Sequence, residues 1–328
     1  LSLLLTDGHG WGDDFALYIK QAKNIAENHD YSDTGYIYNV REPLYSPKLY
    51  PPIYPLFLAL IYKLFGLDFI KLKTVSVLFY VLYLGLLFIF FRKRFSFSIS
   101  ILVVILFGFN PEFFTELDQI LSDFAALFFT MLAILAIEKF SQKTTVFQSI
   151  LLAILFWLSY ASRSAGIVLI PSFILYHLIL NRKITIELML TIGFAVILMT
   201  MQKLLLHEGA YFNFRLIFKD FFGTIFFNIG YYSKILAKSI LRTDVLPIVL
   251  IFVFFVIGGI VLTLYSTKKI DFIFIFSFFF LGLLLIFPSI QGPRYIFPLI
   301  PISLMYGLFF LQKVIKNDQR IIPALLFL

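Results

Sequence analysis

Apolar runs alternate with short polar turns along most of the 328-residue chain. A transmembrane helix needs about 20 mostly apolar residues, and runs of about this length recur. They cover 70–91, 97–113, 119–138, 146–162, 164–180, 184–206, 245–266, 270–288 and 295–313. Shorter apolar runs, Leu1 to Leu5 and 321–328, stand at the two ends, where we expect spans cut by the limits of this sequence. The pattern predicts an all-α, polytopic transmembrane helical bundle of about 11 spans, truncated at both ends.

The basic residues of the turns predict which side of the membrane each turn faces, because short cytoplasmic loops are enriched in Lys and Arg. Basic clusters fall at every second turn: Arg92-Lys93-Arg94, Lys139 with Lys143, Arg182-Lys183, Lys268-Lys269, and Lys313 with Lys316 and Arg320. We assign these turns to the cytoplasm. The alternate turns and the two long loops, at about 6–69 and 207–244, are then predicted to face outward.

The segment 52–66 looks like a span at first sight, but it is too short for one. A helix there covers about 14 residues, roughly 21 Å at 1.5 Å per residue, which is less than the thickness of the hydrocarbon core. The segment also carries Lys63, and counting it as a span would place Arg92-Lys93-Arg94 outside. We therefore predict an interfacial helix on the outer surface, with Gly66 as its C-terminal stop.

Further amphipathic stretches lie in the two outer loops. Within 14–28, Ala22, Ile25 and Ala26 form an apolar stripe, and Gly12-Asp13 is a helix start signal. The loop 207–244 holds an aromatic, basic stretch. We find no internal repeat and no soluble domain in the sequence. The chain is therefore predicted to be one membrane domain, 1–328, with juxtamembrane helices in its first outer loop.

Composition supports the membrane assignment and narrows the choice of partners. Hydrophobic residues make up 60% of the chain and charged residues 14%, which leaves too little polar surface for a soluble protein of this length. The net charge of +8 follows from the basic turns, so nucleic acid is not predicted as a partner. Cys is absent, which excludes disulfide and thiol chemistry. The four His lack metal-type spacing and are interpreted as incidental.

Charged side chains gather on the predicted outer rim, where they are informative because charge within hydrocarbon is costly. These residues are Asp13, Asp14, Glu116, Asp118, Asp123, Arg163 and Arg294. A carboxylate can act as a general base, and a guanidinium can hold a phosphate through two hydrogen bonds. The rim is therefore a candidate site.

The acidic residues also have plainer interpretations. Asp13 and Asp123 both suit helix N-caps, and Asp14 suits a solvated first turn. Asp123 nevertheless lies just inside an apolar run, which favours a functional role. The acidic turn before it is interpreted as a solvated loop rather than a site; it contains Glu112, Glu116 and Asp118.

The basic and aromatic residues of the rim leave similar alternatives. Arg163 can snorkel to the interface. Yet Arg163 and Arg294 stand in outer turns where Lys and Arg are otherwise scarce, which favours a functional role. Several Tyr residues suit an interfacial belt or, for some, stacking on a sugar: Tyr31, Tyr36, Tyr38, Tyr45, Tyr50 and Tyr54.

Five motifs follow one another in a recognisable order. They are Gly12-Asp13-Asp14-Phe15-Ala16-Leu17-Tyr18 with Ala22 and Ala26, Tyr50-Pro51-Pro52-Ile53-Tyr54-Pro55 through Leu64-Phe65-Gly66, Ser122-Asp123, Ser162-Arg163-Ser164-Ala165-Gly166, and Arg294-Tyr295-Ile296-Phe297-Pro298-Leu299-Ile300-Pro301. This ordered set resembles the C-type membrane glycosyltransferases, in the protein-O-mannosyltransferase-like and lipid A aminoarabinose-transferase-like branch. The resemblance covers nearly the whole chain.

The resemblance implies transfer of a sugar from a polyprenyl-phosphate-linked donor to an acceptor hydroxyl on the extracytoplasmic face, with inversion. It implies catalytic roles for Asp13 and Asp14, with Asp13 as the base. It implies substrate binding by Asp123, Arg163, Arg294, Tyr295 and Tyr54. The acceptor, whether lipid, glycan or protein, stays open, and the expected location is a prokaryotic inner membrane with the site facing outward.

The sequence leaves alternatives for both the cofactor and the function. Tyr50-Pro51 stands where the aminoarabinose-transferase branch has an acidic-basic pair, which argues against a metal site and an aminoarabinose donor. We assign no metal ligand and no certain cofactor, although a divalent metal stays open. The alternative function is a transporter or flippase of lipid-linked saccharides, for which midplane polar residues and broken helices would be expected. A non-catalytic membrane scaffold is a third reading.

Overall fold

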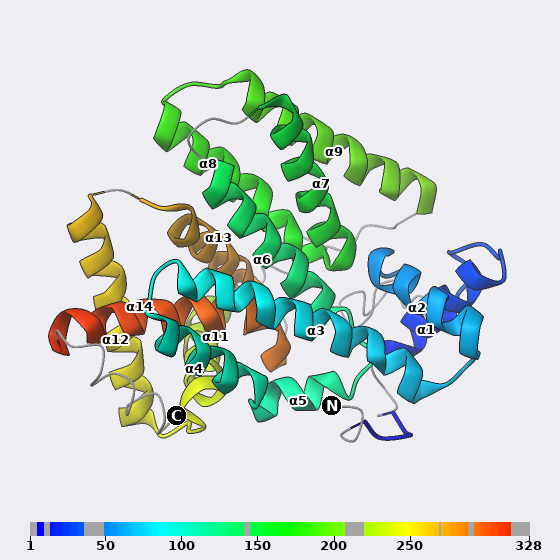
Figure 1. Ribbon diagram of the computed structural model, residues 1–328, viewed down its shortest axis with the longest axis horizontal. Coiled ribbons are helices and arrows are strands. Elements are labelled where there is room, and N and C mark those ends of the chain that lie inside the picture. Colours follow the sequence, from blue (N-terminus) through cyan, green and yellow to red (C-terminus); the bar gives the residue numbers. More distant parts are fainter. Residues whose placement is uncertain are drawn as a thin grey trace. The chain divides into compact units, whose positions relative to one another are not determined.

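The computed structural model describes residues 5–9, 14–35, 49–140, 145–206, 220–268, 270–287 and 292–315, and the described part of the chain is helical, without strands (Figure 1). It divides into two compact units. Unit 1 comprises 1–83, 114–170 and 183–216, and unit 2 comprises 84–113, 171–182 and 217–328.

Unit 1 holds the predicted juxtamembrane helices together with three helices that pack in sequence. Helix α1 (Phe15–Ala26) packs on α2 (Ile53–Phe65), and α6 (Asp123–Phe140), α7 (Val146–Ser162) and α9 (Ile186–Leu206) pack side by side. The 3-10 helix η2 (Ser164–Val168) folds back on α7. The described residues that the sequence predicts to face outward in the first loop are therefore carried on helices.

Unit 2 is organised around α12 (Leu246–Thr267) and α14 (Ile300–Ile315), which pack closely. A Cβ at Gly259 of α12 would lie 1.9 Å from the carbonyl oxygen of Tyr306 on α14, so only glycine allows this approach. Helices α11 (Phe221–Leu241) and α13 (Phe272–Ile286) pack on one another and on the 3-10 helix η3 (Pro293–Leu299). Small residues at such contacts are typical of membrane helices.

Five described helices are long and apolar enough to cross a membrane. They are α3 (Phe69–Arg92), η2 with α8 (Ser164–Asn181), α9, α12, and η3 with α14 (Pro293–Ile315). Helices α7 and α13 are apolar but shorter than 18 residues. The helical membrane fold is thus confirmed, while the number of about 11 spans stays a prediction, and the runs 1–4 and 321–328 lie outside the described residues.

Two predicted spans differ from the prediction: one is bent, and the other begins later. The run 97–113 is not one straight helix: α4 (Phe97–Gly108) and α5 (Pro111–Leu117) meet at a bend of 51°. Pro111 has no N–H to continue α4, and the Asn110 side chain accepts the N–H of Glu112 at 3.0 Å, which starts α5 instead. The run 119–138 becomes helical only at Asp123, because residues before it bond to distant side chains.

Helix α2 has the length and the stop predicted for an interfacial helix. It covers 13 residues and ends at Gly66, whose φ of 69° suits glycine and whose N–H reaches the carbonyl of Tyr62 at 2.8 Å. One face is buried, and the other exposes an apolar stripe of Leu56, Leu60 and Leu64. The stripe has the chemistry expected of a helix that contacts lipid.

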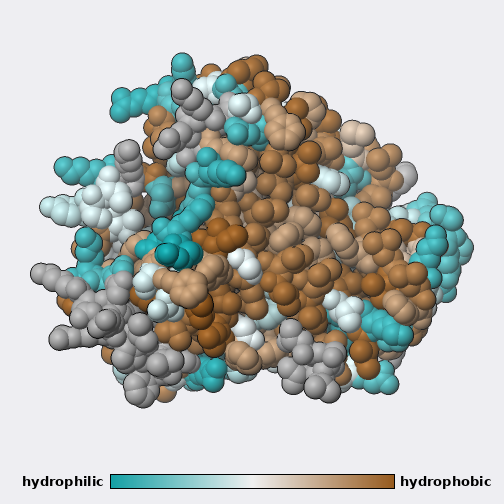
Figure 2. All heavy atoms as spheres, in the orientation of Figure 1, coloured by the Kyte–Doolittle hydropathy of each residue, from teal (hydrophilic) through white to brown (hydrophobic). Residues whose placement is uncertain are grey.

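Apolar side chains also cover much of the outer surface of the helices. Large hydrophobic residues are exposed along α9 and α12 and at many other positions, and Figure 2 shows broad apolar areas beside polar patches. A soluble protein rarely exposes apolar patches of this extent. The surface therefore agrees with an integral membrane protein.

Candidate active site

The acidic pair of the first motif lies at the start of α1. Asp14 is the residue before the helix, and its carbonyl accepts the N–H groups of Leu17 and Tyr18 at 3.1 and 3.3 Å. Its side chain makes no capping hydrogen bond. Asp13, predicted as the base and as the helix start, lies outside the described residues. The helix itself, predicted within 14–28, is confirmed as α1.

Tyr18, one turn into α1, connects this helix to the start of α6. Its hydroxyl lies 2.8 Å from Oγ of Ser122, and both side chains are buried. Ser122 directly precedes Asp123, the first residue of α6. The acidic motif at α1 and the acidic position of α6, 104 residues apart at this bond, are therefore neighbours in unit 1.

Asp123 and Arg163 form an ion pair through Oδ1 and Nη1. The Asp123 side chain is 4% exposed and that of Arg163 is 18% exposed. Within the described part of the chain, the second carboxylate oxygen of Asp123, Oδ2, is buried and has no hydrogen-bond partner. A buried charged oxygen in this state is costly, so it marks a place where a donor from outside the described residues would bind favourably.

The turn after Arg163 is shaped by close backbone contact. Arg163 adopts an extended conformation after α7 ends, and Gly166 donates its N–H to the carbonyl of Arg163 at 2.8 Å. A Cβ at Gly166 would lie 2.5 Å from the backbone carbon of Ser159. The small residues of this motif therefore let η2 pack against α7 and fix the direction of Arg163.

Tyr54 of α2 is buried against Tyr18 of α1. Its side chain is fully buried, its hydroxyl lies 2.7 Å from Oγ of Ser76, and its ring meets that of Tyr18 edge-on at 5.3 Å. Burial raises the pKa of its hydroxyl, outweighing the hydrogen bonds from Ser76 and Leu121 that lower it. Tyr54 was predicted to bind substrate; in this structure its ring faces protein on all sides and positions α1 against α2.

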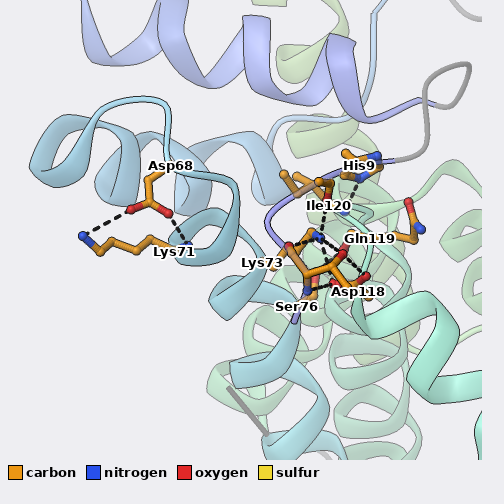
Figure 3. Close-up of polar contacts among 10 residues, drawn as sticks. His9, Asp68, Lys71, Lys73, Ser76, Asp118, Gln119 and Ile120 are labelled. Carbon is orange, nitrogen blue, oxygen red and sulfur yellow. Dashed lines mark hydrogen bonds and ion pairs between the residues drawn. The ribbon is translucent and has the colours of Figure 1, made fainter. Parts of the chain in front are cut away.

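Sequence reasoning missed Lys73, which lies within the first predicted span. Its side chain is 0% exposed, and its ammonium lies 2.7 Å from Oδ1 of Asp118 (Figure 3). The same ammonium donates to the carbonyls of Thr6 and Gly8 at 2.8 and 2.6 Å. A Lys within an apolar run is itself a signal of function, and it could have been found that way.

The structure corrects the sequence interpretation of Asp118 and His9. Asp118 is not part of a solvated loop: it accepts the N–H and the hydroxyl of Thr6 at 2.8 and 2.6 Å, besides the Lys73 pair. His9 is not incidental, because its Nε2 accepts the N–H of Ile120 at 2.9 Å. Neither role could be predicted from the sequence, because Asp118 lies 112 residues after Thr6 and Ile120 lies 111 residues after His9.

The electrostatics of this cluster favour the ionised carboxylate. Partial burial pushes the pKa of Asp118 upward, but the hydrogen bonds from Lys73 and Thr6 and the charge of Lys73 outweigh it, so the pKa lies below its usual value. Asp118 thus stays negatively charged beside the Lys73 ammonium at neutral pH.

Arg294 and Tyr295 lie in unit 2, at the start of η3. The Arg294 guanidinium lies 5.6 Å from the centre of the Tyr295 ring, which is a cation–π contact. Asn228 of α11 donates to the carbonyls of Leu284, Leu285 and Phe287 at 3.2, 3.0 and 3.0 Å, which satisfies the C-terminal end of α13 shortly before this turn.

No group of three or more His, Asp or Glu side chains within the described residues could hold a metal ion. The ion pairs Lys73–Asp118 and Asp123–Arg163 instead give unit 1 two opposite-charge pairs close to α1 and the start of α6. A buried pair such as Lys73–Asp118 can hold neighbouring groups in place, whereas a guanidinium such as that of Arg163 can bind an anionic group.

Comparison with known proteins gives a family for part of the chain and a fold for nearly all of it. Residues 50–206 match the family described as Dolichyl-phosphate-mannose-protein mannosyltransferase. Curated proteins give no match. The chain is similar to the crystal structure of ArnT from Cupriavidus metallidurans in the apo state, with a TM-score of 0.54 and 14% sequence identity.

The two matches cover different lengths of the chain. The structural alignment covers 94% of this chain and 56% of ArnT, so the chain spans little more than half the length of that protein. The family segment contains α2, Asp123 and Arg163, and the shared fold extends over both units. The family match over 50–206 and the shared fold agree with the resemblance to C-type membrane glycosyltransferases that the order of the motifs predicted.

Proposed function

We propose that this protein transfers a sugar from a polyprenyl-phosphate-linked donor to an acceptor hydroxyl at the extracytoplasmic face of a prokaryotic inner membrane, with inversion at the anomeric carbon. The acceptor is a lipid, a glycan or a protein. The donor is an amphiphile, so its lipid lies in the bilayer while its phosphosugar reaches the rim. The basic turns assigned to the cytoplasm leave the rim of α1 and α6 on the outer side.

The observation that carries the proposal is the junction of three motifs in unit 1. The Tyr18–Ser122 bond at 2.8 Å joins α1 to α6, and Asp123 beside it pairs with Arg163. These residues come from three separate parts of the chain, and two of those parts lie in the segment that matches the mannosyltransferase family. The acidic motif before α1 and the Arg163 guanidinium are the groups proposed to carry out glycosyl transfer.

The reaction assigns one step to each group. The acceptor oxygen attacks the anomeric carbon while the bond from that carbon to the phosphate oxygen breaks, and the electron pair leaves with the phosphate. Asp13 takes the proton of the acceptor hydroxyl, and Asp14 supports it. The transition state is oxocarbenium-like, as in other glycoside chemistry.

Arg163 is proposed to stabilise the charge that develops on the leaving phosphate. Asp123 fixes the guanidinium through Oδ1, and its buried second oxygen, without a partner among the described residues, is a candidate acceptor for a sugar hydroxyl. Arg294 and Tyr295 remain candidates for donor binding from the late motif.

The test is transfer of a labelled sugar from polyprenyl-phosphate donors by the full chain, in membranes that supply the acceptors. Asp13→Asn should lower transfer by roughly 10²- to 10⁴-fold, the usual contribution of a positioned base. Asp33→Asn, which changes an exposed carboxyl in the same loop, is the matched control and should keep full activity. Full activity of Asp13→Asn would refute its role as the base.

The same preparation tests the transporter alternative. A flippase would move the lipid-linked sugar between the leaflets of a vesicle and leave it attached to its phosphate. A glycosyltransferase breaks that bond and yields labelled acceptor and free polyprenyl phosphate. Movement without bond cleavage would therefore contradict the proposal and favour transport.

A further inference from the structure

The buried ammonium of Lys73 contacts two parts of the chain. One is the segment just before the acidic motif of α1, and the other is the turn before α6. It donates to Thr6 O, Gly8 O and, at 3.4 Å, Thr6 Oγ1, and it pairs with Asp118. A Lys that is 0% exposed is costly unless its charge is paired and its donors are used. Figure 3 shows the side chain directed into this cluster.

The neighbouring Lys71 shows what a Lys on the same helix does without such a role. Its ammonium pairs with Asp68 at 3.3 Å, three residues away, and its side chain is 47% exposed. In Figure 3 the two lysines lead to separate clusters. Lys71 is therefore a control for Lys73 that shares helix, charge and side-chain length.

A second contact holds the segment 5–9 against the first residue of α1. The ring of His9 stacks on the ring of Phe15, with their centres 3.6 Å apart and their planes inclined by 22°. His9 also accepts the N–H of Ile120, two residues after Asp118. The residues before position 10 are thus held by Lys73, Asp118 and Ile120. The residues after position 13 are held by the Tyr18–Ser122 bond.

We infer that Lys73 is a positioning residue for the proposed base: with Asp118, it anchors the segment 5–9 and so restricts where Asp13, four residues further along the chain, can act. The inference rests on the proposed function. Its physical basis is that a base must lie within hydrogen-bond reach of the acceptor proton. Holding the residues on both sides of a short stretch of chain restricts where a carboxylate within that stretch can be. A displacement of about 1 Å can cost roughly 10²-fold in rate.

The experiment combines a kinetic and a structural readout on the full chain. Lys73→Met keeps an unbranched, apolar side chain in the buried site and removes the ammonium. Transfer should fall by roughly 10²-fold in kcat, with the KM for the polyprenyl-phosphate donor nearly unchanged, because the anchor does not bind the donor. Lys71→Met should keep both constants.

The structural readout is a nitroxide spin label at Gly8→Cys. The chain has no Cys, so the label is unique, and a Cβ at Gly8 meets no atom within 4 Å, so the substitution is tolerated. Lys73→Met should raise the mobile fraction of the label, and Lys71→Met should leave it unchanged. Because this readout needs no catalysis, it reports on the anchor even if wild type transfers no sugar, which would refute the proposed function alone.

Two results would overturn the inference. One is a label that is equally immobile in Lys73→Met and wild type. The other is a mobile label with unchanged kcat, which would make the anchor irrelevant to the base. If Lys73→Met fails to fold, the pair Lys73→Met with Asp118→Asn removes both charges together and the same two readouts apply.

Discussion

The hydroxyl of Tyr18 lies 2.8 Å from Oγ of Ser122, and this buried bond joins the helix that follows Asp13 and Asp14 to the residue before Asp123. Tyr18 is part of the acidic motif in the sequence, and Ser122 is part of a motif more than 100 residues later. The bond therefore links two groups that the proposed reaction needs in one place.

Tyr18→Phe tests the importance of this link. The substitution keeps the ring, which stacks on Tyr50 and meets Tyr54, and removes only the hydroxyl. We expect unfolding to become easier by about 1 kcal/mol, and transfer to fall by about tenfold through misplacement of α1. Thermal unfolding in detergent and initial transfer rates measure the two effects. Tyr62→Phe on α2 is the control, and equal effects at both positions would contradict the prediction.

The Asp123–Arg163 pair predicts a stability effect that can be separated from the effect on activity. Arg163→Met leaves the buried Asp123 carboxylate without its cation, and we expect a loss of about 3–5 kcal/mol. Adding Asp123→Asn removes the unpaired charge and should restore most of the stability. Transfer should stay lost in both variants, as measured with the labelled donor. A double variant that regains activity would show that the pair is structural only.

Gly166 predicts a local packing effect. A Cβ there would lie 2.5 Å from the backbone of Ser159 and 2.6 Å from the backbone nitrogen of Tyr160, and backbone atoms cannot move aside as a side chain can. Gly166→Ala should therefore destabilise the protein by about 1–3 kcal/mol. Gly193→Ala on α9 meets nothing within 4 Å and should have a neutral or stabilising effect, because Ala is the better helix former. Unfolding midpoints of the two variants should move in opposite directions or differ clearly.

Gly259 predicts the same effect in unit 2. A Cβ there would overlap the Tyr306 carbonyl oxygen at 1.9 Å, so Gly259→Ala should force α12 away from α14 and cost about 1–3 kcal/mol or more. Gly282→Ala on α13, where a Cβ meets nothing within 4 Å, is the control. Thermal unfolding of both variants checks the prediction, and an unchanged midpoint for Gly259→Ala would refute the close approach of the two helices.

Asp118 predicts a pH dependence. Its pKa is lower in the folded protein than the usual value of about 3.9, so its contribution to stability is fully present above that value and is lost as the pH falls through the folded pKa. The difference in melting temperature between wild type and Asp118→Asn should be constant between about pH 5.5 and 7 and should shrink below about pH 4. A difference that grows on acidification would contradict this assignment.

The helices themselves could be predicted from the sequence, because the pattern that defines them is local. Apolar length predicted α3, α9 and α12, an amphipathic stripe predicted α1, and a short apolar run with a terminal glycine predicted α2 as a helix too short to span. Backbone hydrogen bonds in lipid must be satisfied within the segment, so length and composition suffice to predict them.

The partners of the polar residues were decided only by the tertiary structure. Asp118 and His9 looked like solvated or incidental residues, yet Asp118 pairs with Lys73, 45 residues before it, and His9 with Ile120, 111 residues after it. No local pattern records such distances, because a polar side chain near the end of an apolar run can equally face water or another helix. Packing of α1, α3 and the turn before α6 chose between these outcomes. The sequence predicted which residues carry charge at the rim; the fold decided which of them hold one another in place.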